Sequence, residues 1–162
     1  IKIGFGGTDF IPSQKGIIKI EKGSKICFYG KTFLAEGTCI SLEKSSEIIF
    51  GNNFASNKNC IFHSCKSIKF GNDVLVGWNV NFRDNDGHTI FNGEALNDNE
   101  KEVLIKDHVW IASYVDILKG VTIEKKSVVA TRSCVTKKID EENVLIGGYP
   151  AKIIKENISW KK

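Results

Sequence analysis

Aliphatic residues recur at every sixth position in the second half of the chain. Six β-branched residues share this spacing: Ile105, Ile111, Ile117, Ile123, Val129 and Val135. A second track of small or aliphatic residues lies four positions after each of them: Val109, Val115, Val121, Ser127, Ser133 and Ile139. Neither the 3.6-residue period of a helix nor the alternation of a half-buried strand explains this spacing. A period of six is typical of a parallel β-helix, in which each repeat forms one short strand and one turn.

Three repeats are expected to close one triangular coil of about 18 residues. The first residue of each repeat points inward and stacks on its equivalents in the neighbouring coils. Branched side chains suit this position because their χ1 angle is already restricted. The residue four positions later lies at a corner, where only a small side chain fits. Because backbone hydrogen bonds run from coil to coil, no coil is expected to be stable alone.

The same lattice extends, less regularly, towards the N-terminus. Three sets of residues are expected to point inward: Phe28, Leu34 and Ile40, then Phe50, Ser56 and Phe62, then Phe70, Val76 and Phe82. The sets begin 22 and 20 residues apart rather than a multiple of six. Extra residues are therefore expected to bulge at corners near residues 44–47 and 66–69.

The fold class predicted by these patterns is an all-β, single-domain parallel β-helix, and 162 residues suit one domain. Residues 1–16 show no repeat and are expected to cap or lead into the open end, before early coils at 17–82. Late coils follow at 103–139, and a short extension at 140–162 is expected to pack on the last coil. Residues 83–102 are polar and interrupt a coil. A long loop inside a compact repeat array is commonly functional.

Composition and charge exclude several classes of protein. The chain is 41% hydrophobic and 26% charged, which is ordinary for a globular protein. Its net charge of +4 either attracts phosphorylated ligands or reflects a lysine-rich solvated surface. No basic block with interleaved aromatic residues is present, which argues against nucleic-acid binding. No long apolar run is present, which predicts no transmembrane segment. No signal peptide is visible, so the expected location is the cytoplasm, where the protein could also lie near the inner face of the membrane.

Two further features concern the chain's beginning and its cysteines. The sequence begins at Ile1 and contains no Met, so it is expected to be a fragment of a longer protein. The five Cys are odd in number and lack CxxC spacing. They are expected to be small buried residues in a reducing compartment rather than disulfides or a zinc site. The three His also lack metal-ligand spacing, so no metal is expected.

His88 is the main candidate for chemistry. A general base must have a pKa near neutrality and lie within reach of a hydroxyl, and His meets the first condition. His88 lies in the interrupting loop beside Asp84 and Asp86, and a carboxylate bonded to one ring nitrogen would fix its tautomer. The residues alone leave open which Asp does so, and whether His88 is simply an exposed loop residue. His63 and His108 are expected to lie at the surface and at a turn.

The late coils also carry a resemblance. The segment "IKDHVWIASYVDILKGVTIEKKSVVATRSCVTKKI", followed by "GGYPAKIIK", resembles the hexapeptide-repeat acyltransferases, above all sugar O-acetyltransferases of the galactoside, maltose and capsular-polysaccharide types. The similarity spans about residues 50–155. It implies a left-handed β-helix that assembles as a homotrimer, with acetyl-CoA as co-substrate and active sites in the clefts between subunits.

The resemblance also implies roles for individual residues. "RDNDGHTI" resembles the loop that holds the catalytic base of the polysaccharide enzymes, which assigns that role to His88. "GNNFASNKNC" resembles a segment whose Asn holds the acetyl donor and the reacting groups, which points to Asn57, although Asn53 and Asn59 leave the register open and an Asn ladder at the turns is the alternative. Trp110 would line the cleft between subunits or pack in a loop. Six residues match coenzyme-binding positions: Ser113, Thr131, Thr136, Lys137, Lys152 and Lys155.

The function expected from the resemblance is acetyl transfer from acetyl-CoA to a sugar hydroxyl of a surface or capsular polysaccharide or of sialic acid. Ser64 and Cys65 replace two carboxylates that the galactoside enzymes use, which argues against a galactoside acceptor. The alternatives are transfer to a small acceptor such as serine or a galactoside, N-acetylation of an amino sugar, and a catalytically inactive scaffold. A metal-binding β-helix of the carbonic-anhydrase type would need three His ligands at repeat spacing.

Overall fold

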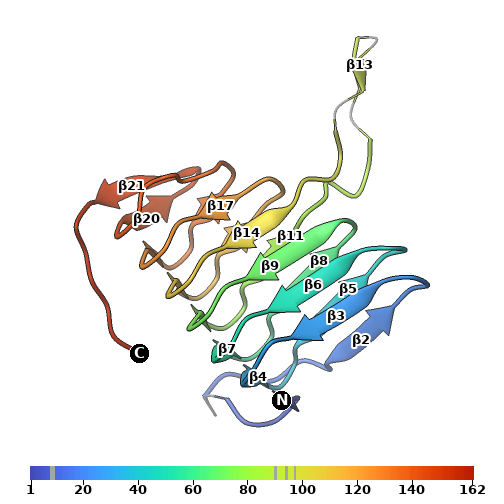
Figure 1. The fold of residues 1–162 in the computed structure, drawn as a ribbon, viewed down its shortest axis with the longest axis horizontal. Coiled ribbons are helices and arrows are strands. Elements are labelled where there is room, and N and C mark those ends of the chain that lie inside the picture. The colour runs from blue at the N-terminus through green and yellow to red at the C-terminus, as the bar shows by residue number, and fades with distance from the viewer. Residues whose placement is uncertain (8–9, 90, 94, 97) are drawn as a thin grey trace.

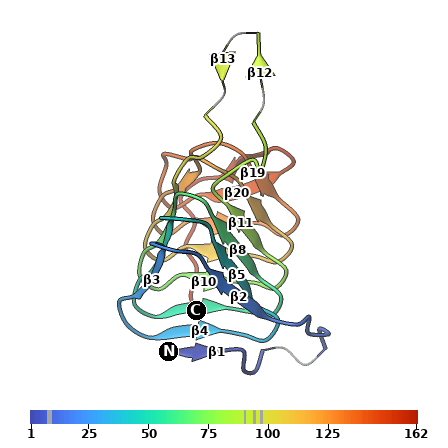
Figure 2. The same cartoon turned by 90° about the vertical axis from the view of Figure 1, so that its right-hand side faces the viewer.

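The chain folds into a triangular β-solenoid whose coils stack along one axis (Figures 1 and 2). The computed structural model describes residues 1–7, 10–89, 91–93, 95–96 and 98–162. Within these ranges the regular structure is entirely β, without a helix. Three parallel sheets form the sides of the prism, and we name them A, B and C.

Each side collects one strand from each coil. Sheet A has the order β1 (Lys2–Ile3), β4 (Thr32–Leu34), β7 (Phe54–Ser56), β10 (Leu75–Val76), β15 (Trp110–Ile111), β18 (Val128–Val129), β20 (Leu145–Gly148) and β21 (Ala151–Lys155). Sheet B consists of β2 (Ile17–Ile20), β5 (Cys39–Leu42), β8 (Ile61–Ser64), β11 (Asn81–Arg83), β16 (Asp116–Ile117) and β19 (Cys134–Val135). Sheet C consists of β3 (Lys25–Phe28), β6 (Glu47–Phe50), β9 (Ser67–Phe70), β14 (Val103–Ile105) and β17 (Thr122–Ile123).

The chain passes through sheets B, C and A in that order in every coil. It therefore turns at three corners, which we call the B–C, C–A and A–B corners. The B–C corner faces sheet A across the prism, as the end-on view shows (Figure 2).

The predicted inward lattice is confirmed by the strand register. In sheet B, Ile40, Phe62, Phe82, Ile117 and Val135 are aligned from coil to coil and are buried. In sheet C the inward column holds parallel aromatic rings, with Phe50 stacked between Phe28 and Phe70 at 5.3 Å on each side. This column continues through Ile105 and Ile123. The core is thus a set of side-chain columns along the axis, in which aromatic rings stack in the early coils and β-branched residues follow in the late ones in sheets B and C.

The predicted corner bulges near residues 44–47 and 66–69 are wrong. The strands on either side of the first corner, β5 and β6, are each four residues long and pair in regular register with the next coil. Leu42 and Ile48 both point inward and are fully buried. The extra residues therefore lengthen two sides of the early coils and add a second inward residue to each.

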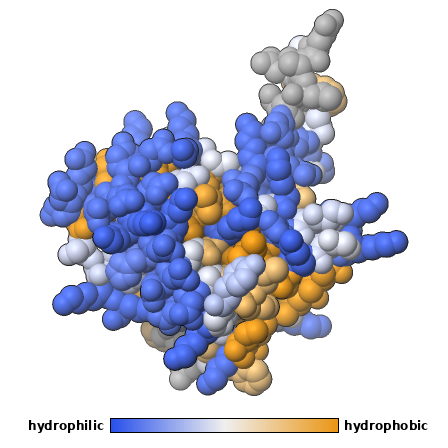
Figure 3. Space-filling model, in the orientation of Figure 1, coloured by the Kyte–Doolittle hydropathy of each residue, from blue (hydrophilic) through white to orange (hydrophobic). Residues whose placement is uncertain are grey.

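The described residues of the N-terminal segment, 1–7 and 10–16, do not close the end of the prism. β1 pairs with β4 at the edge of sheet A, and residues 10–14 follow the A–B corner. β2 remains at the edge of sheet B, where Ile17, Ile18 and Ile20 are about half exposed, at 56%, 49% and 53%. A hydrophobic area is visible over this first coil (Figure 3). The segment thus leads into the solenoid along one corner and leaves most of its end uncovered.

The interrupting loop, which the sequence predicted at residues 83–102, leaves the prism at the B–C corner, between β11 and β14. Its base is closed by the bridge between Asn85 and Glu100 and by a hydrogen bond from the Lys101 N–H to the Asp84 carbonyl at 2.9 Å. Beyond the base, β12 (Phe91–Asn92) and β13 (Ala95–Leu96) pair as an antiparallel hairpin that projects away from sheet A (Figure 2).

The C-terminal extension returns to the outside of sheet A. β21 pairs antiparallel with β20, and the tail then runs back along the solenoid. The Trp160 ring stacks on the His108 ring at 4.2 Å, and its indole N–H donates to the His108 carbonyl at 3.0 Å. The tail ends where the Lys162 amine donates to the Asn53 carbonyl at 2.8 Å. It therefore packs along several coils rather than on the last coil alone.

Candidate active site

A cavity of about 360 Å³ opens at the A–B corner, and we call it the corner pocket. It lies across several coils, between the outer face of sheet A and the turn into sheet B. Nine residues line it: Asn57, Leu75, Val76, Gly77, Trp78, Trp110, Ala112, Ser113 and Thr131. Concave sites with an apolar lining and a few polar groups are the usual form of small-molecule sites.

Small residues make this pocket possible. A Cβ atom on Gly77 would lie 2.5 Å from Ser113 Oγ and 2.7 Å from the Ser113 nitrogen, so the two coils approach too closely for any side chain there. Ser113 Oγ accepts a hydrogen bond from the Trp78 N–H at 3.2 Å. The Thr131 hydroxyl donates to the Ser113 carbonyl at 3.0 Å. These bonds join three successive coils and fix the floor of the pocket.

Four of the residues predicted from the sequence meet in the corner pocket. They are Asn57, Trp110, Ser113 and Thr131. Trp110 points outward from sheet A and is 38% exposed, as alternation along its strand requires. Asn57 follows β7 directly, and its backbone N–H donates to the Val76 carbonyl at 3.0 Å. Ser113 and Thr131, which were predicted to bind coenzyme A, thus line the same cavity as Trp110, which was predicted to line the cleft.

Sequence reasoning missed Trp78, which forms another wall of this pocket. The Phe10 ring packs edge-on against it, with ring centroids 5.5 Å apart. The signal was present in the repeat, because Trp78 follows inward Val76 by two positions and so falls on a corner. The contact with Phe10 could not be predicted, since residues 1–16 carry no repeat to place them.

His88 lies on the loop at the B–C corner, on the opposite side of the prism from sheet A (Figure 2). It is exposed. The described residues contain no hydrogen bond or ion pair to its ring. Within one chain, the proposed base is therefore separated from the corner pocket.

Among the described residues, no hydrogen bond or ion pair joins Asp84 or Asp86 to His88. Asp86 forms an ion pair with Lys119 at 2.5 Å. Asp84 is fully buried and accepts hydrogen bonds from the Cys65, Lys66 and Ser67 N–H groups at 2.7 to 2.8 Å. It also accepts from the Ser64 hydroxyl at 2.7 Å. The expectation that Asp84 orients His88 is thus not supported by this geometry, because its carboxylate binds the neighbouring turn instead.

The remaining predicted coenzyme residues are spread over the late coils. Thr136 and Lys137 follow β19 at the B–C corner and are exposed, so sheet B separates them from the corner pocket within one chain. Lys152 lies opposite Gly147 on β21, towards the A–B corner, whereas Lys155 lies opposite Leu145 at the other end of that strand. Of the four, Lys152 lies on the same corner as Thr131.

The cysteines and the other histidines fit structural roles. Burial raises the pKa of the Cys60 thiol to about 12 and that of the Cys65 thiol to about 11, so both stay protonated and are poor nucleophiles near neutral pH. His63 lies 3.6 Å from Glu43 on the outside of sheet B. The part of the chain that the structure describes contains no cluster of three His, Cys, Asp or Glu residues able to hold a metal.

Comparison with known proteins identifies relatives, although no protein-family description matches the chain. The galactoside O-acetyltransferase of Escherichia coli K12 is 35% identical over 116 residues, which cover 68% of this chain and 55% of that protein. The polysialic acid O-acetyltransferase of Escherichia coli O1:K1 is 31% identical over 147 residues, which cover 90% of this chain and 45% of that protein. The chain thus spans about half the length of these two relatives.

A solved structure supports the same assignment. A galactoside acetyltransferase in complex with coenzyme A superposes with a TM-score of 0.68 at 26% identity, over 83% of this chain and 65% of that one. The chain therefore belongs to the hexapeptide-repeat acetyltransferases, and its fold is the left-handed parallel β-helix of that family. Within the described residues, no helix is long and apolar enough to cross a membrane.

Proposed function

We propose that the protein transfers an acetyl group from acetyl-CoA to a sugar hydroxyl of a surface or capsular polysaccharide or of sialic acid. The observation that carries this proposal is the convergence of Asn57, Trp110, Ser113 and Thr131 in the corner pocket. Relatives named for galactoside and for polysialic acid support a saccharide acceptor. Use of acetyl-CoA favours the cytoplasm, where this donor is made.

The pocket suits the thioester end of coenzyme A. Gly77, Ala112 and Ser113 are small, so a narrow chain can lie along the outside of this corner, and Trp110 offers a flat apolar wall. The exposed amine of Lys152 lies farther along the same corner, where it would meet a phosphate of the donor. Coenzyme A would supply an acyl group activated as a thioester.

His88 is proposed to act as general base and then as general acid. It removes the proton from the acceptor hydroxyl as that oxygen attacks the carbonyl carbon of the acetyl group. Backbone N–H groups, together with the Asn57 side chain, would stabilise the negative charge on the carbonyl oxygen. His88 then returns the proton to the departing sulfur, so the imidazole is regenerated in each turnover.

The position of His88 supports a site shared between subunits. The loop and the corner pocket lie on opposite sides of one prism, so the base would be supplied by a neighbouring chain in a homotrimer. Thr136 and Lys137 lie on the same side as the loop and would also meet the donor from a neighbouring subunit.

The test is release of free thiol from acetyl-CoA over a panel of sialic acid, oligosialic acid, lipopolysaccharide core sugars, galactosides and serine. We expect release with a glycan, and a loss of about 10² to 10⁴ in turnover for His88→Ala with unchanged affinity for coenzyme A. His63→Ala is the matched control, because His63 lies on the outside of sheet B. Near-native turnover of His88→Ala would remove His88 from the mechanism. Failure to bind coenzyme A at all would leave only the scaffold function.

A further inference from the structure

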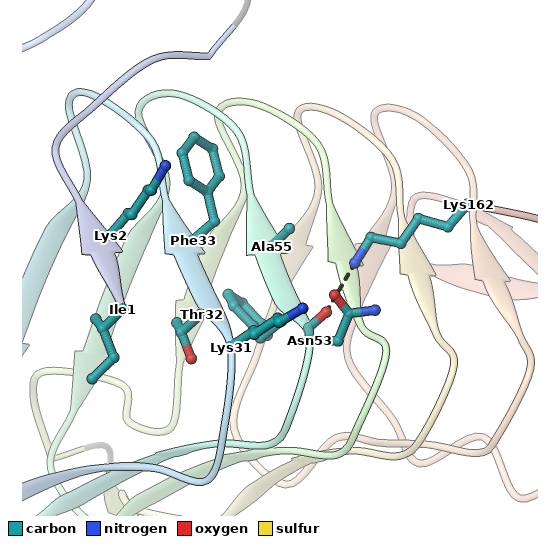
Figure 4. A pocket seen from close by; sticks show the side chains of 9 residues that line it. Ile1, Lys2, Lys31, Thr32, Phe33, Asn53, Ala55 and Lys162 are labelled. Atoms are coloured by element: carbon teal, nitrogen blue, oxygen red, sulfur yellow. Dashed lines mark hydrogen bonds between the residues drawn. The ribbon is translucent and has the colours of Figure 1, made fainter.

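A second cavity, of about 390 Å³, lies on sheet A near the N-terminal end of the solenoid. Three lysines from distant parts of the sequence, Lys2, Lys31 and Lys162, line it (Figure 4). Its apolar surface comes from Phe33, Phe54 and Ala55 among others. We call it the lysine pocket. The acetyl-transfer mechanism proposed above makes no use of it.

The three amines lack carboxylate partners at ion-pair distance within the described chain. This differs from sheet C, where Lys25 and Lys69 both pair with Glu47 at 3.0 and 3.4 Å. The pKa of Lys162 is lowered, because burial outweighs the opposing effect of the Asp73 charge. Asp73 itself accepts a hydrogen bond from the Asn53 side chain at 2.6 Å. The pocket therefore holds a surplus of positive charge beside one neighbouring carboxylate.

One row of outward side chains connects the two cavities. Phe33, Ala55, Leu75 and Trp110 are aligned in register on four adjacent strands of sheet A. Phe33 and Ala55 line the lysine pocket, whereas Leu75 and Trp110 line the corner pocket. Three strand spacings separate the ends of this row, or about 14 Å. A single sugar cannot reach both cavities, but a saccharide chain can.

Segments from the beginning and from the end of the sequence border this row. On the A–B side, Phe10 packs on Trp78, held by hydrogen bonds between the N-terminal segment and Asn59. On the C–A side, Trp160 lies 6.0 Å from Trp110. The tail then reaches Asn53 through Lys162, as the dashed line in Figure 4 marks. Apolar side chains flanked by aromatic rings suit the less polar faces of sugar rings.

We propose that the sheet A row binds an anionic saccharide chain, with the reacting sugar in the corner pocket and an acidic group of a more distant sugar in the lysine pocket. This inference rests on the proposed saccharide acceptor. It adds that the acceptor is a polymer and carries carboxylate, phosphate or sulfate groups. Charge complementarity selects this occupant over a neutral glycan, since three lysines line the pocket at the far end of the row and the amines of Lys31 and Lys162 both lie near Asn53 (Figure 4).

The test compares binding of sialic acid and of α2,8-linked oligomers of increasing length by calorimetry. For the native protein we expect affinity to rise once the oligomer spans both pockets. For the double variant Lys31→Gln/Lys162→Gln we expect at least a tenfold loss of affinity for long oligomers, little change for the monomer, and a weaker dependence on salt. The double variant Lys22→Gln/Lys44→Gln is the matched control, because these exposed lysines lie at the B–C corner.

Several outcomes would overturn the inference. They are an equal loss in the control pair, equal binding of neutral maltooligosaccharides, and no length dependence. Weaker binding of coenzyme A alone to the Lys31/Lys162 variant would assign the lysine pocket to the donor. A changed oligomeric state of that variant, measured by sedimentation, would mean that another copy of the chain covers this face.

Thiol release from acetyl-CoA, measured with the same oligomers, separates this inference from the proposed activity. Length-dependent binding without transfer would support the inference and count against the acetyltransferase. Transfer to small acceptors without binding of long oligomers would support the acetyltransferase activity and contradict the inference.

Discussion

Two aspartates at the base of the loop, Asp84 and Asp86, lie in different environments. Asp84 and Asp86 are two positions apart and looked equivalent in the sequence, yet Asp84 is buried with four donors from one turn whereas Asp86 faces Lys119. The repeat located both in the loop. It could not distinguish them, because the partners of Asp84 come from the preceding coil and that of Asp86 from the following coil, and both depend on how the loop leaves the prism.

Asp84→Ala is expected to destabilise the fold rather than impair chemistry directly. The substitution leaves the N–H groups of the 65–67 turn without an acceptor, so the free energy of unfolding should fall by at least about 3 kcal/mol. Urea denaturation measures the loss, and Asp140→Asn, an exposed pair with Lys138, serves as control. Well below its melting temperature, the Asp84 variant should keep most of its turnover. A loss of turnover without a loss of stability would show that Asp84 acts on His88 after all.

Strands and corners were the elements most accessible from the sequence. The six-residue lattice placed the inward residues of the late coils and one inward residue on each side of the early coils, because the coil-to-coil register is set by apolar side chains stacking on one another. It failed where the sides lengthen by two residues, since a longer strand and a bulged corner give the same spacing in sequence. It also could not place the tail, whose contacts through Trp160 follow no period.

Ion pairs on the outside of sheet C predict a pH dependence. Hydrogen bonds from Lys25, then Ser67 and Lys69, hold the pKa of Glu47 below its ordinary value of 4.5. Because the folded pKa is lower than the unfolded one, Glu47 contributes stability that is present above about pH 4.5 and is lost as pH falls through the folded pKa.

Glu47→Gln is therefore expected to cost roughly 1 kcal/mol of unfolding free energy at pH 7 and almost nothing at pH 3. Chemical denaturation at the two pH values checks this, with the exposed Glu141→Gln as control. An equal cost at both pH values would mean that Glu47 acts through packing rather than charge.

At the scale of the whole molecule, the separation of the His88 loop from the corner pocket carries the strongest expectation. If each site takes His88 from one chain and Trp110 from the next, His88→Ala and Trp110→Ala are each inactive alone but complement each other in mixed trimers. Random mixing in equal amounts puts both intact groups at about one site in four, so about a quarter of native activity should return.

Co-expression of the two variants, followed by thiol-release assays, makes this measurement. Mixing of separately purified trimers that do not exchange subunits is the control and should stay inactive. No recovery in co-expressed protein would place His88 and Trp110 in the same site of a single chain.

The closed base of the loop separates the residues beyond it from the coils, so those residues can change without changing the coils. Asn85 pairs with Glu100 and Lys101 bonds back to Asp84, so β11 and β14 are joined before the chain departs for the hairpin. Insertions, deletions and substitutions beyond these two contacts then leave the hydrogen bonding between the coils intact. A solenoid organised in this way can exchange one peripheral segment, while the corner pocket on the far side of the prism is inherited unchanged.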